Sequence, residues 1–261
     1  MTDYNSKDLT VGLKTLGVTD SDTLFIHAGL RSLGKIDKDP NDSTLELIFD
    51  AFLKTIGDTG TIAVPTFNFD FCKGMPFDKQ HTPGVGMGAF SEFIRLKLGS
   101  KRSRHTFHSI SCWGSNAHEI CEGEGKSEFS PGSSLDILLQ KNAKIVFLGV
   151  DFVETFVHLA EERVGVPYRF WKSFSGTYID MGEETHRVES FYARDLDLKP
   201  EPDLDVPRIG KELHRDGIIR YTGVGQGKIG CCNANELVSY ISEKLKENPT
   251  QYLHEEKNPH I

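Results

Sequence analysis

The chain carries a cluster of acid–base side chains at helical spacing directly behind an apolar run. The cluster is in VETFVHLAEE, residues 153–162. If this segment is a helix, Glu154 and Thr155 lie four and three residues before His158 and can share its face. Glu161 lies three residues after the histidine and shares that face as well. Because a carboxylate beside an imidazole fixes its tautomer and raises its basicity, the spacing is typical of a proton-transfer site.

The position of this segment favours catalysis over the other interpretation, a solvated helix that meets the spacing by chance. The preceding apolar run, residues 145–150, is expected to be a buried strand. A helix entered from the carboxyl end of a buried strand opens at the sheet edge where ligands bind, with its amino terminus facing the crevice. We therefore expect His158 to lie in a binding site.

Strands and helices are expected to alternate over the first two thirds of the chain. The expected strands are residues 23–27, 61–67, 109–113 and 145–150. The first expected helix is capped by Ser6 and ends before Gly17, and the second covers 44–56 and is capped by Asp42-Ser43. Two more helices are expected over 86–98 and 134–141. This pattern predicts an α/β fold, with a mixed β-sheet core flanked by helices on both faces.

The last third of the sequence has a different pattern. Residues 173–181 and 187–194 are expected to be paired antiparallel strands, followed by a loop over 198–207, a short helix, a glycine-rich strand region over 218–230, a helix over 235–246 and a disordered polar tail. We therefore predict one domain over residues 1–261. Its core would be residues 1–170, with a smaller antiparallel β-rich lobe and the terminal helix over about 171–261.

Composition limits the classes of function. The chain has 261 residues, of which 38% are hydrophobic, enough for a real core, and a formal net charge of −8 that disfavours nucleic-acid binding. The five cysteines show no CxxC spacing, as expected of reduced cytosolic thiols. The start of the chain lacks a signal-peptide pattern, and no apolar run reaches the roughly 20 residues that span a bilayer. We expect a cytoplasmic protein with a small-molecule partner, no nucleic acid and no membrane, which could form a homo-oligomer.

Two further motifs have both a functional and a structural interpretation. TGVGQGKIG, residues 222–230, is similar to a phosphate-binding loop, but it lacks a GK[ST] ending and no helix follows it, so a tight turn is favoured. Thr66 ends the apolar run TIAVPTF, where its hydroxyl could donate to a developing oxyanion at the sheet edge. A β-branched residue that simply finishes a strand explains Thr66 equally well.

Metal and thiol chemistry are weaker alternatives. His105 and His108 could bind zinc with His158 as a third ligand, but no carboxylate or cysteine ligand lies beside them and the adjacent arginines suit an anion. We therefore expect no metal. A nucleophilic Cys72 or Cys112 with His158 as its base is also possible, although most cysteines of cytosolic chains are buried fillers.

Several stretches, taken in order, resemble the aminoglycoside 3-N-acetyltransferase family, which is distinct in fold from the GNAT acyltransferases. They are LFIHAGLRSLGKI (24–36), VPTF (64–67), PFDKQHTPGVGMGAFSEFIR (76–95), RSRHTFHSISCWG (102–114), SPGSSLDILL (130–139) and LGVDFVETFVHLAE (148–161). An ordered series over most of the chain is more specific than any single motif. The resemblance implies an acyl-coenzyme A co-substrate, with acetyl-CoA or another short acyl-CoA as the donor.

The resemblance also implies residue roles. His158 would be the catalytic base, Glu161 its supporting carboxylate and Thr66 the hydroxyl near the thioester carbonyl. Glu154 is a second candidate for orienting the histidine. The residues implied to hold the pantetheine arm and phosphates are Ala28, Gly29, Leu30, Arg31, Ser32, Leu33, Gly34, Arg102, Ser103, His105 and Ser109.

Two positions depart from the family's pattern: His105-Thr106 stands where His-Pro is common, and Glu154 where Asn or Asp is common. The segment FNFDFCKG, residues 67–74, is more similar to relatives that modify surface-polysaccharide sugars. We therefore expect an acyl-CoA-dependent N-acyltransferase that acylates the primary amine of a nucleotide-linked or polysaccharide-precursor amino sugar by direct transfer. The alternatives are an aminoglycoside 3-N-acetyltransferase that confers antibiotic resistance, and a catalytically silent binding protein.

Overall fold

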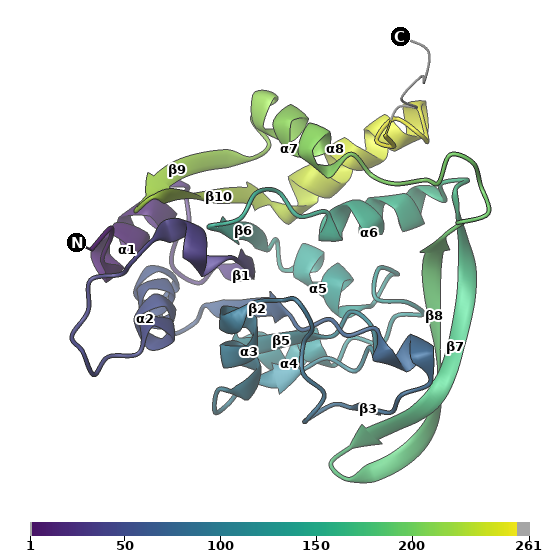
Figure 1. Cartoon of the computed structure of the whole chain (residues 1–261), viewed down its shortest axis with the longest axis horizontal. Helices are drawn as coiled ribbons and strands as arrows, with labels where there is room; N and C mark the ends of the chain where they lie inside the picture. The colour runs from purple at the N-terminus through teal and green to yellow at the C-terminus, as the bar shows by residue number, and fades with distance from the viewer. Residues whose placement is uncertain (1, 255–261) are drawn as a thin grey trace.

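A large mixed sheet forms the centre of the protein in the computed structural model, which describes residues 2–254 (Figure 1). Its strands, in spatial order, are β4 (Lys101–Arg102), β5 (Ile110–Gly114), β2 (Thr61–Pro65), β1 (Thr23–Ala28), β6 (Lys144–Leu148), β10 (Gly227–Asn233) and β9 (Arg220–Val224). Strand β1 pairs in parallel with β2 and β6, whereas the outer pairings are antiparallel. The carboxyl ends of three parallel strands therefore meet at one edge.

Helices cover both faces of this sheet, because its central strands are apolar on both sides. In β1, Leu24 and Ile26 pack into one cluster and Phe25 into another. The first cluster includes residues of α1 (Ser6–Thr15), α2 (Thr44–Ile56) and α3 (Ala89–Leu96); the second includes residues of α4 (Ala117–Cys121), α5 (Ser134–Gln140), α6 (Thr155–Val164), α7 (Val206–Arg215) and α8 (Ala234–Glu247). The predicted fold class is confirmed.

A long antiparallel hairpin stands beside the sheet. Its strands are β7 (Arg169–Asp180) and β8 (Glu183–Arg194), and the two-residue strand β3 (Phe77–Asp78) pairs in parallel with β7 (Figure 1). The expected antiparallel lobe is therefore present, but it includes fewer residues of the last third of the chain than predicted. The chain after the hairpin returns to the core, because β10 pairs with β6 in the large sheet.

Local capping explains where the first helices begin. As predicted, α2 starts after Ser43, whose hydroxyl accepts a hydrogen bond from the Glu46 amide, and it ends at Gly57 with φ +66°. The cap of α1 is Asn5 rather than the predicted Ser6. The Asn5 side chain accepts the amides of Lys7 and Asp8, and the Asp8 carboxylate accepts the Asn5 amide, which together form a capping box.

Other differences from the sequence-based expectation concern short elements. The 3₁₀ turns η1 (Leu30–Leu33) and η2 (Asp70–Lys73), together with α4, β3 and β4, are too short to show a periodic pattern. The predicted turn in residues 222–230 is confirmed as the β9–β10 hairpin, where Gly225 has φ +58° and a Cβ would lie 2.2 Å from the Leu33 carbonyl oxygen. The end of the predicted polar tail lies outside the described residues. Within residues 2–254, none of the helices has the length and apolar character needed to cross a bilayer.

Candidate active site

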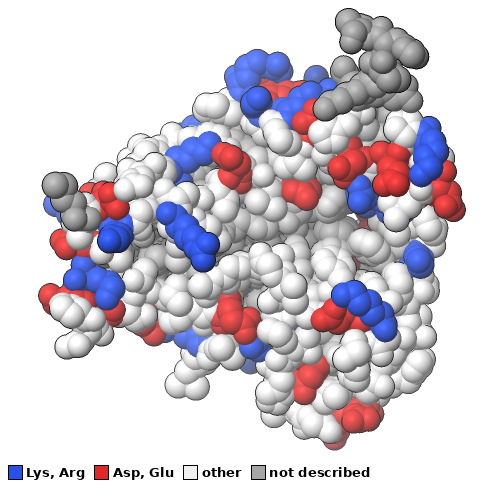
Figure 2. Space-filling view, viewed as in Figure 1, with Lys and Arg blue, Asp and Glu red and all other residues white. Residues whose placement is uncertain are grey.

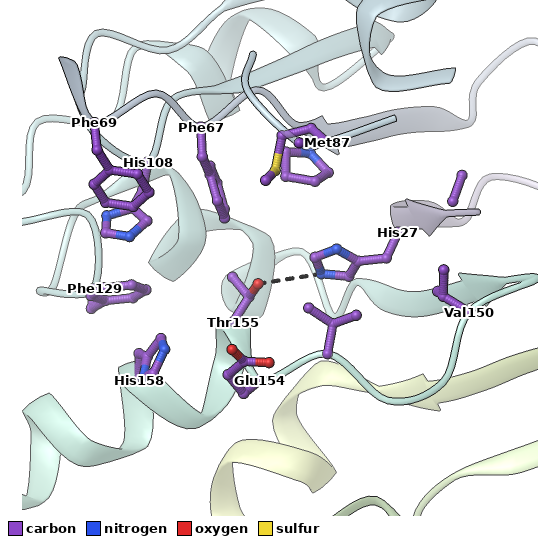
Figure 3. Close-up of a pocket in the computed structure, with 14 residues that line it drawn as sticks. His27, Phe67, Phe69, Met87, His108, Phe129, Val150, Glu154, Thr155 and His158 are labelled. Atoms are coloured by element: carbon purple, nitrogen blue, oxygen red, sulfur yellow. Dashed lines mark hydrogen bonds between the residues drawn. The ribbon is translucent and has the colours of Figure 1, made fainter. Parts of the chain in front are cut away.

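A cavity of about 320 Å³ opens where the parallel strands end. It is lined by the ends of β1 and β2, the segments that follow β2 and β6, and the first turn of α6 (Figure 3). The lining residues are His27, Ala28, Pro65, Phe67, Phe69, Gly86, Met87, His108, Phe129, Val150, Val153, Glu154, Thr155 and His158. As the sequence predicted, His158 therefore reaches a cavity at the carboxyl edge of the sheet.

His158 is held by Glu161, one helical turn further along α6. Nδ1 of His158 lies 2.6 Å from Oε2 of Glu161, whose side chain is fully buried. The hydroxyl of Tyr168 donates to the other carboxylate oxygen, Oε1, at 2.8 Å. With the Nδ1–H directed at Glu161, the Nε2 atom carries the lone pair that a base needs.

Arg169, at the start of β7, completes this network. Its Nη2 atom lies 2.9 Å from Oε2 of Glu161 and 3.0 Å from Nδ1 of His158, and its Nη1 donates to the Tyr192 carbonyl. Burial alone would raise the pKa of Glu161, but the charges and hydrogen bonds of His158, Arg169 and Tyr168 hold that pKa below its usual value. Glu161 is therefore an ionised carboxylate in an interior site.

A second cavity, of about 350 Å³, shares four lining residues with the first: His158, Glu154, His108 and Phe69. Its other lining residues are Arg169, Phe191, Arg194, Asp203, Leu204 and Val206. In Figure 2 the surface is hollowed between α6 and the β7–β8 hairpin, and acidic and basic side chains lie on both sides of the hollow. His158 is thus accessible from two adjoining cavities.

Two further histidines line the first cavity. Nε2 of His27 lies 3.3 Å from the Thr155 hydroxyl, and burial lowers the pKa of His27 to about 3. His108 packs against four aromatic rings, those of Phe67, Phe69, Phe129 and Phe191. Burial also lowers the pKa of His108 well below its usual value, so both imidazoles are neutral at neutral pH. Figure 3 shows His158, Phe129 and His108 along one side of the cavity and His27 on the other.

The structure does not bring Thr66 into this cavity. Pro65 and Phe67 line it, and the hydroxyl of the fully buried Thr66 donates instead to the Ser109 carbonyl at 2.9 Å. The reason is the alternation of an extended chain, which turns every second side chain to the opposite face. The hydroxyl that lines the cavity belongs to Thr155.

Glu154 and Glu161 have different surroundings. Glu154 lines both cavities, whereas Glu161 is buried beneath His158. Among the described residues, the carboxylate within hydrogen-bonding distance of the imidazole is that of Glu161. The question that the sequence left open, which carboxylate orients His158, therefore has the answer Glu161.

The loop expected to hold the acyl donor reaches the cavity at Ala28. Behind it, Gly29 allows a close approach, because a Cβ there would lie 2.5 Å from Cγ1 of Val150. The Ser32 hydroxyl donates to backbone carbonyl groups, and Leu33 is buried. Leu30 and Gly34 are half-buried, and Arg31 is an exposed cation.

The second expected donor segment, residues 102–109, is mostly engaged inside the protein. The buried Arg102 donates to the carbonyls of Thr66, Lys79 and Thr82 and to the Ser109 hydroxyl, and burial lowers its pKa to about 10. The Ser103 hydroxyl accepts the Ile110 amide, and Nδ1 of His105 accepts the amides of Phe107 and His108. Within this segment, His108 is the residue that lines the cavity. Most polar groups of Arg102, Ser103, His105 and Ser109 are therefore engaged within the protein, and their contact with the donor stays a prediction.

Thiol and metal chemistry receive no structural support. Burial raises the pKa of Cys72 and, more strongly, that of Cys112, and neither residue lines the cavities at His158. A thiol with a raised pKa is a poor nucleophile. Over residues 2–254, no group of three or more His, Cys, Asp or Glu side chains is arranged to hold a metal ion.

Sequence reasoning missed three site residues. His27 ends a predicted strand, so its position at the carboxyl edge of the sheet was a usable signal. His108 enters the sequence analysis only as a possible metal ligand and as part of the expected donor segment, residues 102–109. The contact of Arg169 with His158 and Glu161 has no local signal in the sequence, because it depends on how the hairpin packs against α6.

Comparison with known proteins places the chain in a family. The sequence model described as aminoglycoside 3-N-acetyltransferase matches residues 25–246. The chain is 28% identical, over 62% of its length and 66% of the relative's, to the SPbeta prophage-derived aminoglycoside N(3')-acetyltransferase-like protein YokD of Bacillus subtilis (strain 168). It is 24% identical to aminoglycoside N(3)-acetyltransferase III of Salmonella sp, over 84% of this chain and 85% of that protein.

Solved structures share the fold. The structure of AAC-IIIb in binary complex with CoASH superposes with a TM-score of 0.80 at 19% identity, covering 93% of this chain and 96% of that one. The family match spans most of the sequence and includes the strand, helix and hairpin residues that build the site around His158. The chain therefore belongs to the aminoglycoside 3-N-acetyltransferase family and is an N-acyltransferase with an acyl-coenzyme A co-substrate.

Proposed function

We propose that this protein transfers an acetyl group from acetyl-coenzyme A to a primary amine of an aminoglycoside, with His158 as the general base. The family description and the names of the curated relatives specify aminoglycosides as acceptors. The nucleotide-linked amino sugar expected from residues 67–74 finds no support among them, so the aminoglycoside alternative replaces it.

The observation that carries this proposal is the position of His158 between two cavities. One cavity is mainly apolar and the other carries charged side chains, and both are lined by His158 and Glu154. Two-substrate transfer without a covalent intermediate needs this arrangement, because donor and acceptor must meet beside one base. The buried Glu161 keeps the imidazole in the tautomer that the reaction requires.

The first cavity suits the thioester end of the donor. Pro65, Phe67, Val150 and Val153 provide apolar walls for an acetyl group and the adjoining pantetheine chain. Ala28 connects the cavity to the loop that carries the exposed Arg31. A guanidinium is a suitable partner for the donor's phosphates, so Arg31 takes the place of the buried Arg102 in the donor site.

The second cavity suits a hydroxylated, amine-bearing acceptor. Arg194 and Asp203 form an ion pair in its wall, and Arg169 pairs with Glu161. The carboxylate of Glu154 faces both cavities. This carboxylate can therefore attract the ammonium group of an aminoglycoside and hold it beside His158.

The bond changes follow from this placement. The neutral amine nitrogen attacks the thioester carbonyl carbon and forms the C–N bond, while Nε2 of His158 accepts the amine proton. The C–S bond then breaks, and the proton passes from His158 to the departing sulfur, which yields the amide and a free thiol. General-base catalysis contributes about 10²- to 10⁴-fold, and holding the amine against the thioester could contribute about 7–11 kcal/mol.

The test is a thiol-release assay with acetyl-coenzyme A and a panel of amines that contains aminoglycosides and nucleotide-linked amino sugars. We expect release only with aminoglycosides, and mass spectrometry of the product should place one acetyl group on an aminoglycoside amine. His158→Ala should retain donor binding by calorimetry and lose turnover. His118→Ala is the matched control, because His118 is exposed on α4 and lines neither cavity.

Each other outcome excludes part of the proposal. Donor binding without thiol release on any amine would favour a silent binding protein. Release with nucleotide-linked amino sugars alone would replace the acceptor, and full turnover by His158→Ala would remove the base. A stable acetyl adduct on the protein after incubation with donor alone would exclude direct transfer.

A further inference from the structure

Nδ1 of His158 has two close neighbours that cannot both form a hydrogen bond with it, Glu161 and Arg169. Nδ1 of His158 lies 2.6 Å from Oε2 of Glu161 and 3.0 Å from Nη2 of Arg169. A ring nitrogen has one in-plane position for either a proton or a lone pair, so Nδ1 cannot donate to Glu161 and also accept from Arg169. One of these two contacts must therefore be something other than a hydrogen bond.

The shorter distance decides between the two arrangements. An imidazole nitrogen and a carboxylate oxygen 2.6 Å apart need a proton between them, since two lone pairs at that distance repel. Nδ1 of His158 therefore carries a proton, and the Arg169 guanidinium faces an N–H group. The favourable partner of Arg169 in this triangle is Oε2 of Glu161, at 2.9 Å.

The position of Arg169 is fixed by its surroundings. Its side chain is 6% exposed, and its Nη1 donates to the backbone carbonyl of Tyr192 on the neighbouring strand β8. In a buried site, water screens a fixed cation only weakly. Arg169 therefore acts on the His158 ring electrostatically, in opposition to Glu161.

Other ionisable groups near His158 do not duplicate this effect. Glu154 lines the same cavities, Arg194 is paired with Asp203, Tyr168 remains a neutral phenol because burial raises its pKa, and His108 remains neutral because burial lowers its pKa. Among the described residues, Arg169 supplies the cation that contacts both His158 and Glu161.

We infer that Arg169 is a positioning residue that sets how tightly His158 holds a second proton. Glu161 makes the ring basic enough to take a proton from the amine, and Arg169 makes the resulting imidazolium acidic enough to release that proton to the departing sulfur. This inference rests on the proposed function of His158 as the base. It adds that the charges of Glu161 and Arg169 act on the His158 ring in opposite directions.

The variants Arg169→Gln and Arg169→Lys test the charge. Without the cation, the ring binds its second proton more tightly. In the plot of kcat/KM against pH, the fall on the acidic side, the acidic limb, should therefore move to higher pH by about one unit in Arg169→Gln. Arg169→Lys keeps the charge and should leave the limb near its original pH. Arg163→Gln is the matched control, because Arg163 is on α6 but pairs with Asp136 away from both cavities.

A measurement on the unmodified enzyme separates this inference from the identity of the acceptor and from any folding defect of the variants. Nitrogen-15 NMR of histidine-labelled protein, with His158 assigned by loss of its signal in His158→Gln, should show neutral His158 protonated at Nδ1. Neutral His158 protonated at Nε2 would overturn the inference. So would an Arg169→Gln enzyme whose acidic limb coincides with that of the parent. Lack of aminoglycoside acetylation together with the expected NMR signal would contradict only the proposed acceptor.

Discussion

The hydroxyl of Thr155 lies 3.3 Å from Nε2 of His27, a residue 128 positions earlier in the chain. The contact joins the first turn of α6 to the end of β1 and lies in the wall of the cavity at His158. The hydroxyl in the wall of this cavity is therefore that of Thr155, whereas the Thr66 hydroxyl donates to the Ser109 carbonyl outside it.

Thr155→Val and Thr66→Val should therefore affect different properties. The first should lower kcat, and the second should lower the stability of the fold. Thr155→Val removes a polar group beside the expected thioester carbonyl and should lower kcat by about 10²-fold, the usual effect of losing one oxyanion donor. Thr66→Val removes a buried hydrogen bond to Ser109 and should cost about 1 kcal/mol of stability with kcat unchanged. Steady-state kinetics and chemical denaturation distinguish the two, and a catalytic loss confined to Thr66→Val would restore the sequence-based assignment.

Glu161→Gln should reduce kcat by about 10²-fold or more, because a neutral amide no longer stabilises the imidazolium form of His158. Donor affinity should persist, since Glu161 lies beneath the histidine and lines neither cavity. The control is Glu162→Gln, whose parent carboxylate accepts hydrogen bonds from the Ser127 hydroxyl. Equal turnover in the two variants would show that the buried carboxylate does not support the base.

Arg31→Gln and Arg102→Lys should separate donor binding from folding. Arg31 is exposed on the donor loop, so its loss should raise the KM for acetyl-coenzyme A several-fold, with the difference shrinking at high salt. Arg102→Lys cannot reproduce the donors that Arg102 directs at three backbone carbonyls, so it should lower the melting temperature. A normal melting temperature with a raised KM in Arg102→Lys would return that residue to the donor site.

Stability should fall as the pH decreases from about 6.5 towards 3. Burial lowers the pKa of His27 from 6.5 to about 3, so between these values the unfolded chain binds a proton that the folded protein does not. Unfolding is therefore favoured by acid in this window, with a slope of up to about 1.4 kcal/mol per pH unit for this group. Urea denaturation across this pH window should show that the free energy of unfolding of His27→Gln depends less steeply on pH than that of the parent. Identical slopes would contradict the burial of His27 as a neutral imidazole.

The sequence by itself determined the fold class and which helix carries His158 and Glu161. Apolar runs such as that of β6 are buried on both faces and must lie inside a sheet, and the spacing in α6 directs His158 and Glu161 to one side. Both are local properties, since they depend on residues within one or two helical turns. The family resemblance rests on the same local stretches.

Only the tertiary structure decided which groups from distant parts of the chain meet. Arg169 reaches His158 because the hairpin packs beside α6, and His27 reaches Thr155 because β1 and β6 are neighbours. The family resemblance implies a place in the site for Thr66 and Arg102, but both side chains are buried, where Thr66 donates to the Ser109 carbonyl and Arg102 to the Thr66 carbonyl. Which side chains from distant segments meet, and how deeply each is buried, depends on long-range packing, which residue spacing does not encode.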